Sequence, residues 1–155
     1  MHEAELFGFL GSSNSRAAGG LPEIEVVAAN LKRAGFECHE EGHAFLGQYI
    51  GLTVEHPPTL LIAGERIASW TRFEPSAVCT VRDARISRRC ATVAGVALMP
   101  VGVDSFHLTI YSGSDGRFYA GFDSSVYRYG NSRNDMFSMM KNGVRPSFLG
   151  DWAAQ

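Results

Sequence analysis

The sequence predicts a single α+β domain in which helices pack on a mostly antiparallel sheet. The chain has 155 residues, of which 45% are hydrophobic and 19% charged, as expected for one globular domain. Along the chain, helical patterns come first, then strands, a middle helix, more strands and a closing helix. Because this order lacks the strict strand–helix alternation of parallel sheets, we expect mostly antiparallel pairing.

The first part of the chain predicts two short amphipathic helices. Residues 1–20 form a poorly defined N-terminal segment, since Gly11 to Gly20 is rich in small and polar residues that are typical of a loop. Apolar residues then recur at helical spacing from Pro22 to Gly35, with proline in the first turn and glycine as the C-terminal cap. A second helix is expected over Glu40 to Ile50.

Three short strands and a middle helix are predicted next. Leu52 to Glu55 and Thr59 to Ile62 resemble strands that are separated by His56-Pro57-Pro58. Arg66 to Phe73 is a third strand, which the following Glu-Pro pair ends. The pattern from Pro75 to about Val93 is helical, with apolar residues on one side and arginines along another.

The strongest strand pattern lies in the C-terminal third. Val96 to Val103 is apolar, but Pro100 and Gly102 restrict it to an edge, a bulge or a bend. Residues 106–111 and 118–122 alternate between apolar and polar positions on either side of an Asp-Gly turn. This pattern predicts a β-hairpin with one buried face.

One more strand and a closing helix complete the expected fold. The strand covers Ser125 to Tyr129, and the helix begins near Asn131 or Ser132 and runs to Asn142. Its methionine-rich stripe is typical of adaptable core packing. Residues 144–155 are expected to form a C-terminal tail.

Composition argues against several classes of protein. The three cysteines are widely spaced, so neither a disulfide framework nor a zinc ribbon is indicated, and a reducing cytoplasm fits best. No apolar stretch approaches the ~20 residues of a membrane span. The net charge of -2 and the pI near 6.2 provide no basic excess for direct nucleic-acid binding. Phosphate loops, dinucleotide fingerprints and nucleophile elbows are absent, so we expect no cofactor and no catalytic residues.

One string resembles a zinc peptidase motif. In His39-Glu40-Glu41-Gly42-His43, two histidines four residues apart could bind zinc and a glutamate could polarise water, with Glu65 or His56 as a third ligand. However, Gly35 ends the preceding helix four residues earlier, and Gly42 costs about 1 kcal/mol of helix stability relative to alanine. The first histidine then falls at or before the helix start. Zinc hydrolysis is therefore kept as an alternative, and no metal is expected.

A succession of short motifs resembles a known family. The segments LKRAGFECH, AFLGQYIGLTV, RFEP, MPVG and DGRFYAG, in this order and spacing, are similar to the third subfamily of the SUKH superfamily of bacterial immunity proteins. The resemblance covers about Leu21 to Gly143, so residues 21–143 are expected to form the SUKH-like domain. It departs at GSSNSRAAGG, where members commonly have an AGW segment containing arginine, and at Ile50-Gly51, where a double glycine is frequent.

The resemblance implies a protein that binds and neutralises a bacterial toxin domain, often a nuclease or a deaminase. Residues 1–60 contain eight glutamates against three basic residues, and an acidic surface would attract a basic toxin. The expected toxin-binding residues are the densest acidic cluster and the aromatic residues suited to anchor an interface: Glu37, Glu40, Glu41, Trp70, Tyr127 and Tyr129. Because the superfamily also includes cellular regulators, a regulatory protein-binding module is a further alternative.

Overall fold

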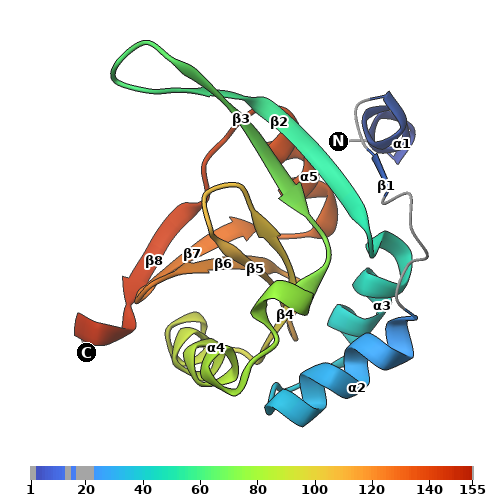
Figure 1. Cartoon of the computed structure of the whole chain (residues 1–155), viewed down its shortest axis with the longest axis vertical. Coiled ribbons are helices and arrows are strands. Elements are labelled where there is room, and N and C mark those ends of the chain that lie inside the picture. Colours follow the sequence, from blue (N-terminus) through green and yellow to red (C-terminus); the bar gives the residue numbers. More distant parts are fainter. Residues whose placement is uncertain (1–2, 13–14, 17–22, 155) are drawn as a thin grey trace.

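An antiparallel sheet organises the molecule, and its strands follow one another in sequence order (Figure 1). The computed structural model describes residues 3–12, 15–16 and 23–154, and all counts refer to these residues. The eight strands are β1 (Ser15–Arg16), β2 (Leu52–Leu60), β3 (Arg66–Arg72), β4 (Leu98–Asp104), β5 (Thr109–Gly113), β6 (Phe118–Phe122), β7 (Ser125–Gly130) and β8 (Ser147–Asp151). The helices are α1 (Glu3–Ser12), α2 (Ile24–Ala34), α3 (Glu40–Tyr49), α4 (Val81–Ala94) and α5 (Arg133–Lys141). Two 3-10 turns, η1 (Pro75–Val78) and η2 (Trp152–Ala154), complete the elements.

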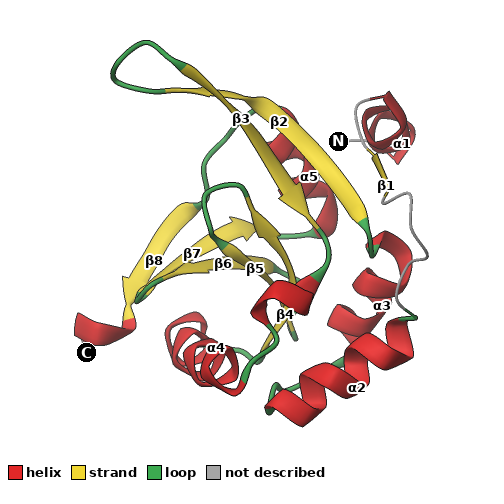
Figure 2. Ribbon diagram, viewed as in Figure 1, coloured by secondary structure: helices red, strands yellow, loops and turns green. Residues whose placement is uncertain are grey.

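Helices cover both faces of the central strands (Figure 2). The larger core includes side chains of α1, α2, α3 and α5 and Ala84 of α4, whereas other apolar side chains of α4 pack in a smaller cluster across the sheet. Neighbouring residues of β5 show the division, since Ile110 belongs to the larger core and Tyr111 to the smaller one. Because side chains alternate along a strand, β5 and β6 are buried on both faces. The predicted α+β domain with helices packed on an antiparallel sheet is confirmed.

The inward side of α3 fixes this helix on the sheet. A Cβ atom at Gly42 would lie 2.5 Å from the Met99 Sδ atom, so only glycine permits this close approach of α3 to β4. Phe45 packs among aromatic rings, with centroid distances of 5.0 Å to Phe73 and 4.9 Å to Phe118. These are distances at which aromatic pairs add to the energy of burial. The predicted second helix is therefore confirmed, with the glycine in a packing role.

Several elements differ from the expectations. The two strands predicted around His56-Pro57-Pro58 form the single strand β2, whose pairing with β3 shifts register between His56 and Thr59. Prolines have no backbone N–H to donate, so a bulge accommodates them without ending the strand. The helix predicted from Pro75 starts as η1, and a capping box at Thr80 then begins α4.

The structure also settles the alternatives for the strand that contains Pro100 and shows elements near both ends of the chain that were not expected. Of the alternatives for this strand, the bulge is confirmed, since β4 shifts register between Pro100 and Gly102. The strand is not at an edge, because β4 lies between β3 and β5. Within residues 1–20 the described parts form α1 and β1, and residues 147–151, expected as tail, pair with β7 as β8.

Candidate functional site

The HEEGH string straddles the start of α3, and its first histidine has a structural role. His39 is the N-cap of α3, where its Nδ1 atom accepts a hydrogen bond of 3.2 Å from the Gly42 N–H. Because Nδ1 accepts, Nε2 carries the hydrogen and donates to the Ser112 carbonyl oxygen at 3.1 Å. Burial lowers the pKa of His39, which favours the neutral ring. Both ring nitrogens are thus engaged within the fold.

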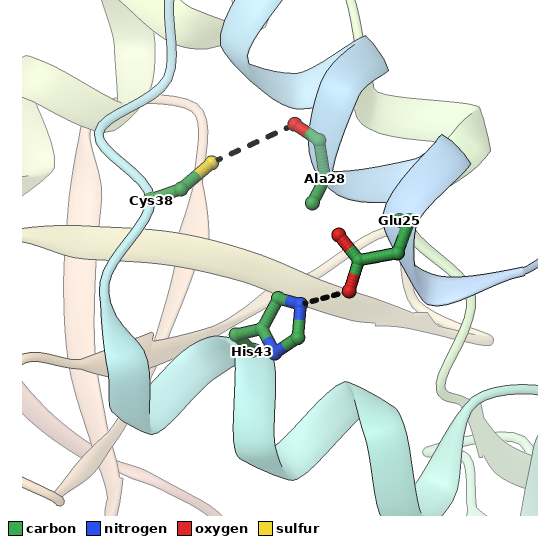
Figure 3. A network of polar contacts seen from close by, with 4 residues as sticks. All are labelled: Glu25, Ala28, Cys38 and His43. Carbon is green, nitrogen blue, oxygen red and sulfur yellow. Dashed lines mark hydrogen bonds and ion pairs between the residues drawn. The ribbon is translucent and has the colours of Figure 1, made fainter.

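The second histidine of the string points toward a different element. His43 Nε2 lies 3.2 Å from the Glu25 Oε1 atom on α2, and the close-up shows the two side chains facing each other (Figure 3). Nearby, the Cys38 thiol donates to the Ala28 carbonyl oxygen at 4.0 Å, again toward α2. Among the described residues, no group of three or more His, Cys, Asp or Glu is arranged to hold a metal ion. His39 is thus held within the fold, whereas His43 contacts Glu25 of α2 at the surface.

The predicted acidic residues gather at the start of α3. Glu37, Glu40 and Glu41 are exposed, and the latter two occupy the first turn, where negative charge interacts favourably with the helix dipole. Asp115, in the turn between β5 and β6, joins them, since Glu37, Glu41 and Asp115 are all close enough to His39 to raise its pKa against the effect of burial. We call Glu37, Glu40, Glu41 and Asp115 the acidic surface. Sequence reasoning missed Asp115 because it lies in the hairpin turn.

The predicted aromatic residues lie elsewhere and in unlike environments. Trp70 is half-buried on β3, with the Arg72 guanidinium 5.9 Å from its ring centroid. Tyr127 is half-buried on β7 and packs against Phe148 of β8 at 5.7 Å. Tyr129 is only 3% exposed and belongs to the larger core. The structure therefore does not bring the expected residues together as one site, and Tyr129 is buried whereas Trp70 and Tyr127 are half-buried.

A cavity of about 390 Å³ lies between the β2–β3 hairpin, the β4–β5 turn, the strands β6 and β7 and the segment that leads from α5 to β8. We call it the sheet pocket. Its described lining mixes aromatic, apolar and polar side chains, among them His56, Asp104, Phe106, Phe122, Tyr127 and Arg145. The buried Tyr129 also lines it. The sequence predicted Tyr127 and Tyr129 as toxin-binding residues and offered His56 as a possible zinc ligand, but it did not indicate that these residues share a pocket.

Two ionisable groups of the sheet pocket are held by the fold. His56 Nε2 lies 3.0 Å from Thr71 Oγ1 and Nδ1 lies 3.3 Å from Ser69 Oγ, while burial lowers the pKa of His56 to about 4. Asp104 Oδ1 accepts hydrogen bonds of 2.8 Å from the backbone N–H groups of Phe106 and Leu108. Burial raises the pKa of Asp104, although these two hydrogen bonds favour its ionised form. At neutral pH the pocket therefore holds a neutral imidazole.

The comparisons with known proteins identify a family. The family model described as SUKH-3 immunity protein matches residues 20–143. No curated protein and no solved structure gives a significant match to the chain. Among the described residues, no helix is long and apolar enough to cross a membrane. The family match spans most of the sheet and four of the five described helices, α2 to α5. The chain therefore belongs to the SUKH-3 immunity protein family.

Proposed function

We propose that this protein neutralises a cognate bacterial toxin domain by binding it, without catalysing a reaction, in the cytoplasm of the cell that it protects. The observation that carries the proposal is the family match over residues 20–143, because the family is one of immunity proteins. The engagement of both His39 ring nitrogens within the fold supports a binding protein over a zinc hydrolase. A nuclease or deaminase is the proposed class of toxin.

We further propose that the acidic surface guides the toxin to its binding site. Nuclease active sites are basic because they bind phosphates, so exposed carboxylates on the inhibitor accelerate association. Glu40 and Glu41 are suited to this role since α3 is anchored by its buried side and presents them to solvent. Trp70 and Tyr127, both half-buried, remain proposed anchors at the interface.

Neutralisation is tested by co-expression. The toxin domain encoded next to this gene is expressed with and without the protein, and cell growth is measured. Rescue of growth, together with a complex isolated by size-exclusion chromatography, is the expected result. If none of the neighbouring toxin domains is neutralised or bound, the toxin proposal is wrong and the regulatory protein-binding module takes its place.

The role of the acidic surface is tested by two matched charge reversals. Glu41→Lys and Glu65→Lys each change the charge by the same amount, but Glu65 lies in the exposed turn between β2 and β3, away from α3 (Figure 1). For a basic toxin, Glu41→Lys should slow association about threefold or more and weaken its dependence on salt, whereas Glu65→Lys should have little effect. Equal association rates for both variants and the wild type would place the interface elsewhere.

A further inference from the structure

We propose that the sheet pocket binds an arginine side chain of the toxin, with the Asp104 carboxylate pairing with the guanidinium group and aromatic rings packing against it. The identity of the partner rests on the proposed function. The chemistry of the pocket is independent of it and can be tested with a small molecule. Three features of the pocket support a cationic, planar ligand: a carboxylate oxygen with no hydrogen-bond partner among the described residues, aromatic walls and a neutral histidine.

The carboxylate of Asp104 is oriented and only half satisfied. The residue is 7% exposed, and its Oδ1 atom takes both backbone hydrogen bonds, from Phe106 and Leu108. Oδ2 has no hydrogen-bond partner among the described residues. Two side-chain atoms of the described residues are both fully buried and without a partner, Arg128 Nε and Trp152 Nε1. Asp104 Oδ2 is not one of them, so it is not fully buried. Oδ2 is therefore accessible in a pocket that Asp104 lines. A cation there would form a charge-assisted hydrogen bond with an oxygen that has already lost most of its water.

The walls of the sheet pocket suit the flat face of a guanidinium. Phe106, Phe122 and Tyr127 come from the β4–β5 turn, β6 and β7, and all three contribute to the lining. Phe106 is 39% and Phe122 44% exposed, so their rings are available at the entrance. Arginine is more weakly hydrated than lysine and stacks on aromatic rings while it pairs with a carboxylate. The volume of about 390 Å³ lies within the range of about 300–1,000 Å³ typical of ligand sites.

Two other ionisable side chains of the described lining, His56 and Arg145, do not oppose a cation strongly. His56 is neutral at physiological pH because burial lowers its pKa to about 4, and its two nitrogens are engaged by Ser69 and Thr71. Arg145 is the one permanent cation among the described lining residues, and it is exposed, so solvent screens its charge. An anionic side chain would instead face the Asp104 carboxylate, and among the described lining residues Arg145 alone carries a permanent positive charge that would compensate.

The ligand class is tested with N-acetyl-arginine methylamide as the probe and N-acetyl-citrulline methylamide as its uncharged isostere. The protein is labelled in its aromatic side chains and titrated with each compound by NMR. We expect saturable shifts of the Phe106, Phe122 and Tyr127 ring signals with the arginine compound, and binding at least about tenfold weaker with the citrulline compound. Equal binding of both compounds, or no binding of either, would overturn the proposal.

Asp104→Asn tests the carboxylate with little change in shape. The asparagine oxygen can still accept the two backbone hydrogen bonds that Oδ1 accepts, so the turn should persist, and the backbone amide spectrum checks this. Affinity for the arginine compound should fall at least about tenfold. If this variant does not fold, Arg145→Glu on the exposed rim replaces it and should raise affinity about twofold or more. Unchanged affinity for the arginine compound in a folded Asp104→Asn protein, or in Arg145→Glu where that variant replaces it, contradicts the proposal.

Experiments with the toxin separate this inference from the proposed function. If a neighbouring toxin is neutralised, Asp104→Asn should weaken that complex at least about tenfold, and an unchanged complex would show that no toxin arginine occupies the pocket. Binding of the arginine compound without neutralisation of any toxin would support the arginine-binding chemistry of the pocket and refute a toxin as the protein that supplies the arginine. Neutralisation without binding of the compound would uphold the proposed function and overturn the arginine site.

Discussion

Lowering the pH from about 7.5 to about 5 should destabilise the fold through His56. This side chain is held in the wall of the sheet pocket between Ser69 and Thr71, and burial lowers its pKa from 6.5 to about 4. Between these two pKa values the unfolded chain binds a proton at His56 and the folded protein does not. Protonation therefore favours unfolding, and the contribution of His56 to stability is lost as the pH falls through this window.

The size of the effect follows from the same two pKa values. One pKa unit corresponds to about 1.4 kcal/mol, so the full difference corresponds to about 3 kcal/mol at low pH. Between about pH 7.5 and about pH 5, where titration is incomplete, the free energy of unfolding should fall by about 2 kcal/mol. Folded domains typically have a free energy of unfolding of about 5–15 kcal/mol, so a loss of about 2 kcal/mol is a large share of the total.

The assay is urea unfolding of the wild type and of His56→Gln at both pH values, followed by tryptophan fluorescence. Glutamine keeps a polar side chain between the two hydroxyl groups but does not titrate. His39, whose pKa burial also lowers, is present in both proteins, so its effect cancels in the difference. The wild type should lose about 2 kcal/mol more than the variant on acidification. Equal losses in the two proteins would refute the burial of a neutral His56.

Four further substitutions test the packing and capping of the helices by urea unfolding. Gly42→Ala should lower the free energy of unfolding by about 1–3 kcal/mol because the new Cβ atom would meet Met99. Gly47→Ala on the same helix, where a Cβ atom would have nothing within 4 Å, should raise it by about 0.5–1 kcal/mol. The same change in both variants would contradict the close approach of α3 to β4. Leu46→Ala should cost about 2–5 kcal/mol, since Leu46 is fully buried, and a loss under about 1 kcal/mol would refute this placement. Thr80→Ala should cost about 1 kcal/mol by removing the cap of α4, and an unchanged midpoint would show that the capping box contributes nothing.

The predicted elements are those with a local signature. The helical spacing before Gly35 and the alternation around the Asp-Gly turn each depend on neighbouring residues, and both elements form where expected. Residues 147–151 have no such signature, since three successive residues of β8 are exposed and only pairing with β7 makes them a strand. The position of Pro100 was ambiguous for the same reason. Whether a bulge or an edge accommodates a proline depends on the strands on either side.

The candidate site was predictable only where its residues are adjacent in the sequence. Glu37, Glu40 and Glu41 share one segment, so their clustering was visible, whereas Asp115 reaches the same surface through the β5–β6 turn. Tyr127 and Tyr129 lie two residues apart on β7 and therefore share a face, but one is half-buried and the other is in the core. The sequence does not distinguish them because burial depends on what covers each end of the strand.

The glycine within the HEEGH string bears on both interpretations of this segment, as a zinc site and as an acidic binding surface. Gly42 weakens the helix that a zinc site would need, and the same missing side chain lets α3 approach Met99. That contact, together with the buried Phe45, fixes the rotation of α3 about its axis, so Glu40 and Glu41 face solvent. Carboxylates on an anchored helix lose little backbone freedom when a partner binds, which lowers the entropic cost of association. The packing that engages His39 within the fold thus leaves Glu40 and Glu41 exposed to solvent.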